Sequence, residues 1–156
     1  MIIEINPKTI EFHSEIQALC CHSYYRHPNG CPNYAKKFGC PPAQPLINQI
    51  LNFQKPIYLV YTEFNLAAHV AEMRWRHPHW TEHQLYCVLY WQSKARVFQR
   101  HEERRAVKEY GADYICQGPE ASGVNVTKLM RDAAHVILEW LPRQITRLVS
   151  LAGSRI

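Results

Sequence analysis

The sequence predicts an α/β fold, with a single-layer, mostly parallel or mixed sheet of about four strands flanked by helices. Short segments rich in β-branched and aromatic residues alternate with longer segments whose apolar residues recur at helical spacing. This alternation is typical of strands joined by helical crossovers, which leave the joined strands parallel. A cysteine-rich loop near the N-terminus interrupts the pattern, and we interpret it as a metal-binding loop.

The first half of the chain is expected to place two strands and three helices around this loop. Pro45 is well suited to open a helix, because it has no amide hydrogen to leave unpaired in the first turn. Asn65 is a plausible cap for the helix that follows the second strand. In chain order we expect a strand, a helix, the cysteine-rich loop, a helix, a buried strand and a helix, over residues 2–5, 7–19, 20–42, 45–54, 57–64 and 66–76.

The longest predicted element is a helix over residues 81–111. Thr81 and Gln84 have the spacing of a capping box, and Gly111 is a suitable end because glycine readily adopts a left-handed conformation. Beyond it we expect a strand, a helix and two further strands, over residues 112–117, 124–133, 135–140 and 145–152.

Bulk properties favour one domain spanning residues 1–156, with no internal repeat and no linker. No apolar stretch approaches the roughly 20 residues of a membrane-spanning helix. The N-terminal residues do not resemble a signal peptide, so we expect a cytoplasmic protein. In a reducing compartment, clustered cysteines more often serve metal or redox chemistry than disulfide formation.

Four of the six cysteines lie in the segment CCHSYYRHPNGCPNYAKKFGCPP, residues 20–42. Cys31 and Cys40 each stand between a glycine and a proline. Glycine lets the backbone approach closely, and proline fixes the direction of the chain. The spacing of Cys20, Cys31 and Cys40 is wide and includes no CxxC pair, which is unlike a zinc ribbon and suits a loop that wraps around a bulky cluster.

Two cysteines leave alternatives open. Cys116 ends a predicted strand, where sites in α/β proteins gather, and it is either a fourth ligand or a small buried apolar residue. Cys21 is either a substitute ligand or a bystander beside Cys20. Cys87 lies within a predicted helix, and core packing is favoured for it.

Catalytic candidates are weaker. Glu120 lies in the glycine-rich segment of residues 118–126, between a predicted strand and helix, and it is either a general acid or base or a carboxylate that stabilises the helix N-terminus. His69 follows the central strand on a helix, and it either faces the site or has a structural role.

The formal charge of +5 is concentrated in residues 94–105, which contain Lys94, Arg96, Arg100, Arg104 and Arg105. This segment is either a surface for the phosphates of a nucleic acid or a solvated helix face, since Glu102 and Glu103 interrupt the basic run.

With these motifs in view, the chain resembles a group of uncharacterised predicted metal-binding proteins. The matching features are Cys20, the segment HPNGCPNY of residues 27–34, the GCPP of residues 39–42 and the PEASGVNV of residues 119–126. The resemblance implies a cysteine-bound metal centre of the iron–sulfur kind, and it implies no substrate. A cysteine directly beside the PEA triplet would match better than Cys116, which stands upstream of it.

The leading hypothesis is an iron–sulfur protein in which Cys20, Cys31, Cys40 and Cys116 hold a 4Fe–4S cluster. With four protein ligands it would carry electrons to a redox partner. With an open iron it would be an enzyme acting on a small molecule, for instance in sulfur transfer or desulfuration. The alternative is a zinc-stabilised domain that binds nucleic acid through residues 94–105.

Overall fold

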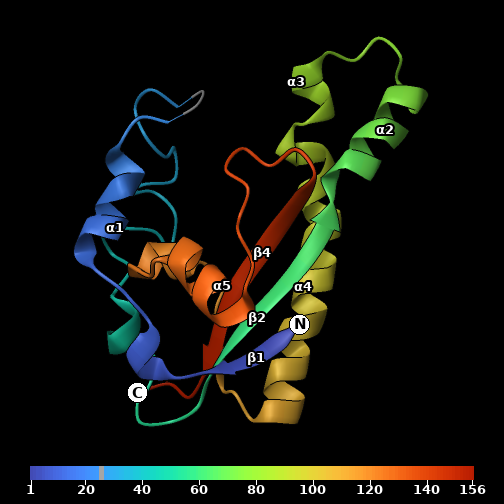
Figure 1. Cartoon of the computed structure of the whole chain (residues 1–156). Helices are drawn as coiled ribbons and strands as arrows, with labels where there is room; N and C mark the ends of the chain where they lie inside the picture. The colour runs from blue at the N-terminus through green and yellow to red at the C-terminus, as the bar shows by residue number, and fades with distance from the viewer. Residues whose placement is uncertain (25–26) are drawn as a thin grey trace.

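The computed structural model describes residues 1–24 and 27–156, so residues 25 and 26 of the cysteine-rich loop lie outside the described part. A four-stranded sheet lies at its centre (Figure 1). Its strands occupy the spatial order β1-β2-β4-β3, and every neighbouring pair is antiparallel. The strands are β1 (Ile2–Ile5), β2 (Ile57–Asn65), β3 (Tyr114–Cys116) and β4 (Ile145–Gly153).

The prediction of a mostly parallel or mixed sheet is therefore wrong, for two physical reasons. First, β2 and β3 do run in the same direction and are joined by helices, but the last strand, β4, lies between them and pairs antiparallel with both. Second, β2 is covered on both of its faces, so its sequence is almost continuously apolar, which is the pattern usually associated with parallel strands.

The two faces of the sheet are covered by different parts of the chain. Side chains of a strand alternate between faces: Ile57, Leu59 and Tyr61 join the larger core, together with residues of α5 (Val126–Ala134) and of the N-terminal segment. Tyr58 and Val60 face α4 (Val88–Tyr110), which lies along the other face. Figure 1 shows α4 on one side of the sheet and α1 (Ser14–Ala18), α5 and the cysteine-rich loop on the other.

Several local predictions are confirmed. Helix α2 (Leu66–Arg76) begins after Asn65, whose side chain accepts a hydrogen bond from the Ala68 amide at 2.9 Å. Thr81 and Gln84 form the expected capping box at α3 (Glu82–Leu85). Gly111 ends α4 in the left-handed conformation, with a φ of 70°.

Other predictions are wrong at the level of single elements. The long helix divides at Cys87, whose extended backbone separates α3 from α4. The predicted helix of residues 45–54 is reduced to the 3₁₀ turn η3 (Ile47–Gln49), although its apolar residues are buried. The predicted helix of residues 7–19 is broken into η1 (Pro7–Thr9), α1 and η2 (Leu19–Cys21).

Residues 135–140 do not form the predicted strand. His135 adopts a left-handed conformation that ends α5, and the side chains of Ile137 and Trp140 are 80% and 82% exposed. The Glu139 carboxylate instead accepts the amides of residues 143–145, which turns the chain into β4. These backbone hydrogen bonds lower the pKa of Glu139.

Candidate metal centre

The cysteine-rich loop begins where α1 passes into η2, which carries Cys20 and Cys21. The Cys31 amide donates a hydrogen bond to the Cys20 carbonyl at 2.7 Å, so two predicted ligands are neighbours through their backbones. Gly30 makes this approach feasible: its φ is +79°, and a Cβ at this position would stand 2.6 Å from the Cys20 carbonyl oxygen. The glycine before Cys31 therefore has the structural role that the sequence motif suggested.

The second Gly–Cys–Pro turn shares the positive φ of its glycine but not the close backbone approach, because a Cβ at Gly39 would meet the Gln44 side-chain oxygen at 3.9 Å. Gly39 has a φ of +80°, and the Cys40 amide donates to the Lys37 carbonyl at 3.1 Å. The Cys40 carbonyl then accepts from the Gln44 amide at 3.2 Å. Cys40 is thus fixed on both sides by short-range hydrogen bonds and stays half-buried.

The thiols of the loop lie close enough to influence one another. Burial is the main cause that raises the pKa of Cys20, and the negative charges that Cys31, Cys40 and Cys21 would carry as thiolates raise it further. A bound cation would reverse this effect, because it favours the thiolate form.

Cys21 differs from Cys20 in its surroundings. It is exposed, and the Tyr34 hydroxyl donates a hydrogen bond to its sulfur, which raises the pKa of Tyr34. Both cysteines line a pocket of about 470 Å³, together with Cys31 and residues 27–30, Pro32, Tyr34 and Lys36. His27 stacks on Tyr24 with ring centroids 4.6 Å apart.

The loop is fastened to the distant 3₁₀ turn η4 (Pro119–Ser122). Gln17 of α1 donates to the carbonyls of Gln44 and Ala121, at 2.7 and 2.8 Å. The Gln44 side chain in turn donates to the Ser122 hydroxyl at 2.9 Å. A bridge between Phe12 and Val124 adds a backbone connection between the same segments.

Cys116 is buried at the end of β3, where its thiol lies 3.6 Å from the Ser122 hydroxyl. Burial raises its pKa, and Glu120 adds to this effect. Glu120 also raises the pKa of Cys20, so its carboxylate lies near both the loop and the strand end. Glu120 is open to solvent, but the protein around it removes enough water to raise the pKa of its own carboxyl group.

His69 lies elsewhere. It is 5% exposed within the second core cluster, where its ring stands 5.8 Å from that of Phe64. Helix α2, which carries it, and the cysteine-rich loop lie on opposite sides of the molecule (Figure 1). Burial lowers the pKa of His69, with a smaller contribution from Lys94. Its Nε2 atom has no hydrogen-bond partner among the residues that the structure describes. The structure does not bring His69 to the cysteines.

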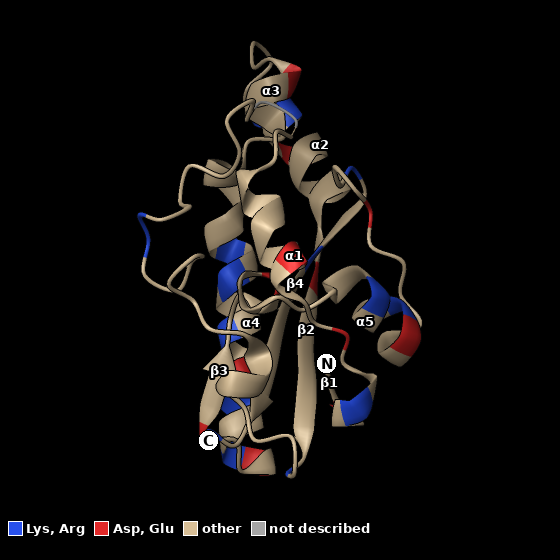
Figure 2. Cartoon of the chain, turned by 90° about the vertical axis from the view of Figure 1, so that its left-hand side faces the viewer, with Lys and Arg blue, Asp and Glu red and all other residues tan. Residues whose placement is uncertain are grey.

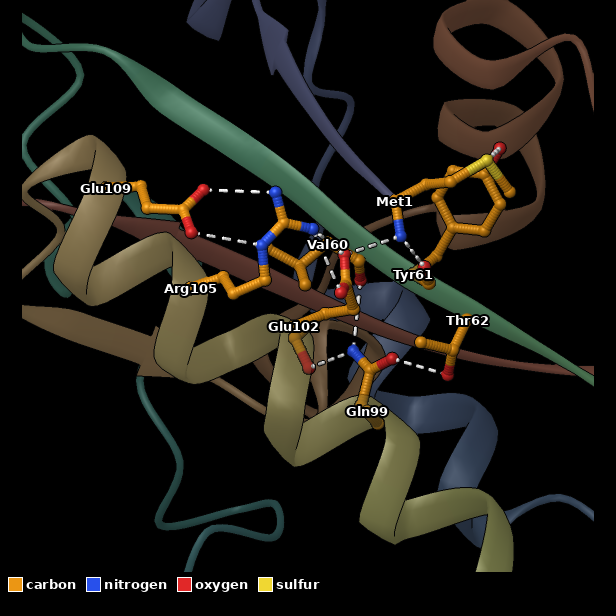
Figure 3. A network of polar contacts seen from close by, with 9 residues as sticks. Met1, Val60, Tyr61, Thr62, Gln99, Glu102, Arg105 and Glu109 are labelled. Atoms are coloured by element: carbon orange, nitrogen blue, oxygen red, sulfur yellow. Dashed lines mark hydrogen bonds and ion pairs between the residues drawn. The ribbon is translucent and has the colours of Figure 1, made fainter.

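A buried polar network between α4 and the sheet was not foreseen. Gln99 donates to the Val60 carbonyl and the Ser150 hydroxyl, and it accepts from Thr62, while Glu103 accepts from Ser150 at 2.6 Å. Figure 3 shows the part of this region in which Glu102 binds the N-terminal amine of Met1 and also Arg105. The signal was present in the sequence, because Gln99 and Glu103 occupy the same helical stripe as Trp91 and Ala95.

Among residues 1–24 and 27–156, no group of three or more His, Cys, Asp or Glu side chains has an arrangement that could hold a metal ion. Within the same described ranges, no helix combines the length and the apolar character needed to cross a membrane. Comparisons with family models, curated proteins and solved structures found no match.

Proposed function

We propose that this protein binds an iron–sulfur cluster through the thiolates of Cys20, Cys31 and Cys40. The observation that carries the proposal is geometric: the Cys31 amide donates to the Cys20 carbonyl at 2.7 Å, and both residues line one pocket. Cys40 lies near enough to contribute to the raised pKa of the Cys20 thiol. Thiolates are the ligands that iron–sulfur clusters require. Cys116 remains our prediction for the fourth ligand.

The donor set fits a cluster better than it fits a single ion. In a cluster, each protein thiolate binds a different iron atom, so the sulfur atoms stand further apart than around one ion. The pocket beside Cys20 and Cys31 has a volume of about 470 Å³, which is ample for such a bulky group. Gln17 and Gln44, which fasten the loop to η4, would hold the ligands in place without themselves binding iron.

When bound, such a cluster supplies one-electron transfer, or Lewis acidity if one iron lacks a protein ligand. The chain's own residues would determine which of these applies. If the Cys116 thiolate binds iron from the end of β3, all four positions are filled by the protein. If Cys116 instead stays buried against the Ser122 hydroxyl, the fourth position remains free. Glu120, whose negative charge raises the pKa of both Cys20 and Cys116, would then be a carboxylate near that position.

The test is anaerobic reconstitution of the full chain with ferrous iron and sulfide, followed by measurement of iron, acid-labile sulfide and visible absorption. We expect a brown protein with equal iron and sulfide. Cys20→Ser, Cys31→Ser and Cys40→Ser should each lose most of both. Cys21→Ser and Cys87→Ser are matched controls and should retain the cluster. The Cys21 sulfur is hydrogen-bonded to the Tyr34 hydroxyl, and Cys87 lies at the start of α4.

Two results would contradict the proposal. One is a colourless protein that binds one zinc ion per chain in competition with iron. The other is loss of iron from the Cys87→Ser control to the same extent as from Cys31→Ser. Cys116→Ser addresses the fourth ligand separately: we expect cluster content to persist and its electron paramagnetic resonance spectrum to change, and an unchanged spectrum would remove Cys116 from the ligand set.

A further inference from the structure

Helix α4 carries a row of basic side chains on the side that faces away from the sheet. Its buried residues include Trp91, Ala95, Gln99, Glu103 and Ala106, which form one stripe against the sheet. The cations Arg96, Arg100, Arg104 and Lys108 follow each other at intervals of four residues on the exposed side. Figure 2 shows basic segments recurring along α4.

None of these four cations forms an ion pair within 4.0 Å with an acidic group among the residues that the structure describes. Within the described part of the chain, the hydrogen bond made by the side chains of this row runs within the row itself, where the Arg100 Nε donates to the Arg96 carbonyl at 3.3 Å. Arg105, another cation of the basic segment, is different, because it pairs with Glu102 and Glu109 at 3.1 and 3.0 Å.

The acidic residues of α4 do not interrupt this row in space, although they interrupt it in the sequence. Glu102 binds Arg105 and the N-terminal amine. Glu103 is buried and accepts hydrogen bonds from Ser150 and Gln117. Glu109 is held by Arg105. The exposed side of α4 therefore presents positive charge that the rest of the described chain does not neutralise.

The spacing suits a partner with regularly repeated negative charge. Four residues of α-helix rise about 6 Å, so the four cations of the row span about 18 Å. Like charges at this spacing repel each other along a helix, and an external anion removes that repulsion. Duplex DNA carries one negative charge per about 1.7 Å of its axis, so a row of this length faces about ten phosphates.

We propose that the exposed side of α4 binds the phosphate backbone of a nucleic acid. A membrane surface fits less well, because a basic amphipathic helix must insert its apolar side into lipid, and the apolar stripe of α4 is already buried against the sheet. Val97, which is 57% exposed, lies among the cations on the helix surface and offers an apolar contact to sugars and bases. The surface lies on the other side of the sheet from the cysteine-rich loop, so the proposal does not depend on a cluster.

The test is fluorescence anisotropy of a labelled duplex DNA of about two helical turns, titrated with the full chain at several salt concentrations. Each phosphate contact contributes about −0.9 to the slope of log K against log salt, so four contacts give a slope of about −3.6. A matching single strand should give about −2.8, since the contribution per contact is about −0.7. Comparison of the two slopes distinguishes duplex binding from single-strand binding.

The triple variant Arg96→Gln, Arg100→Gln, Arg104→Gln should bind at least about tenfold more weakly, with a slope reduced by between about 2 and 3. The control is Lys8→Gln, Lys55→Gln, Arg76→Gln, which removes the same charge from exposed positions off the row and should keep the wild-type slope. Circular dichroism will verify that both variants fold. Equal weakening in both variants would show that net charge alone attracts DNA and overturn the proposal. Wild-type protein that binds anionic phospholipid vesicles but neither DNA would overturn it as well.

Discussion

Replacing Gly30 with alanine tests whether the close backbone approach at the first Gly–Cys–Pro turn holds the site together. A Cβ at position 30 would lie 2.6 Å from the Cys20 carbonyl oxygen and 2.8 Å from the Cys21 carbonyl carbon. Both are backbone atoms, so they cannot rotate away as a flexible side chain would. The substitution therefore forces Cys31 away from Cys20 and breaks the 2.7 Å hydrogen bond between their backbones.

Gly111 is a matched control for the backbone strain. It has a similar positive φ of 70°, but an added Cβ would meet no atom within 4 Å. At both positions alanine costs about 1–2 kcal/mol for the left-handed conformation. Gly30→Ala adds about 1–3 kcal/mol of steric overlap and about 1 kcal/mol for the lost hydrogen bond. The free energy needed to detach the loop sets the upper limit of this cost, since the loop can open locally.

We therefore expect Gly30→Ala to lower the free energy of unfolding by about 2 kcal/mol more than Gly111→Ala does, measured by urea denaturation and circular dichroism. Iron content after reconstitution should fall in Gly30→Ala and remain unchanged in Gly111→Ala. Equal destabilisation by the two substitutions would refute the steric reasoning. Full iron content in Gly30→Ala would refute the claim that the approach of Cys31 to Cys20 matters for the site.

Three further predictions concern the rest of the fold. The pKa of His69 is lowered in the folded state, so protonation of this side chain favours the unfolded chain. The free energy of unfolding should therefore fall as pH drops below about 6.5, by at most about 1.4 kcal/mol per pH unit. Urea denaturation at several pH values should show this slope in the wild type and not in His69→Leu. Asn65→Ala removes the acceptor for the Ala68 amide and should cost about 1 kcal/mol by the same assay, whereas a loss indistinguishable from zero would show that the cap is dispensable. Glu103→Ala leaves Ser150 and Gln117 without their acceptor and should lower the free energy of unfolding by about 3 kcal/mol in urea denaturation. Glu109→Ala, at an exposed position, should lower it clearly less, and comparable losses would contradict a structural role for the buried network.

Local signals in the sequence predicted local structure well. The strand at Ile57, the helix after Asn65 and the end of α4 at Gly111 depend on residues close in the chain, and all three are confirmed. The strand order depends on the placement of β4 between β2 and β3, and the sequence of β4 does not indicate which strands it pairs with. The helical spacing of Ile47 and Leu51 was misleading, because both side chains are buried by a 3₁₀ turn and a bridge to Arg155.

The candidate site was predictable to a similar extent. The Gly–Cys–Pro repeats indicated a close backbone approach before Cys31 and before Cys40. This is confirmed at Gly30 and not at Gly39, where the positive φ marks a turn without a close backbone contact. The glutamines that fasten the loop were not predictable, because Gln17 and Gln44 act through partners that meet them only in the folded chain. The ligand set itself stays a prediction.

Gln17 donates a hydrogen bond to Ala121, and the His13 amide donates one to Gly123. These bonds join the first twenty residues of the chain to a segment that is synthesised roughly a hundred residues later. Chains are synthesised from the N-terminus at about 5–20 residues per second, so Cys20, Cys31 and Cys40 leave the ribosome well before the segment that supports them. Strand β2 likewise cannot complete its pairing until β4, its longest partner, has been synthesised. Assembly of a cluster is therefore expected to follow completion of the chain, and until then the thiols depend on a reducing environment for protection.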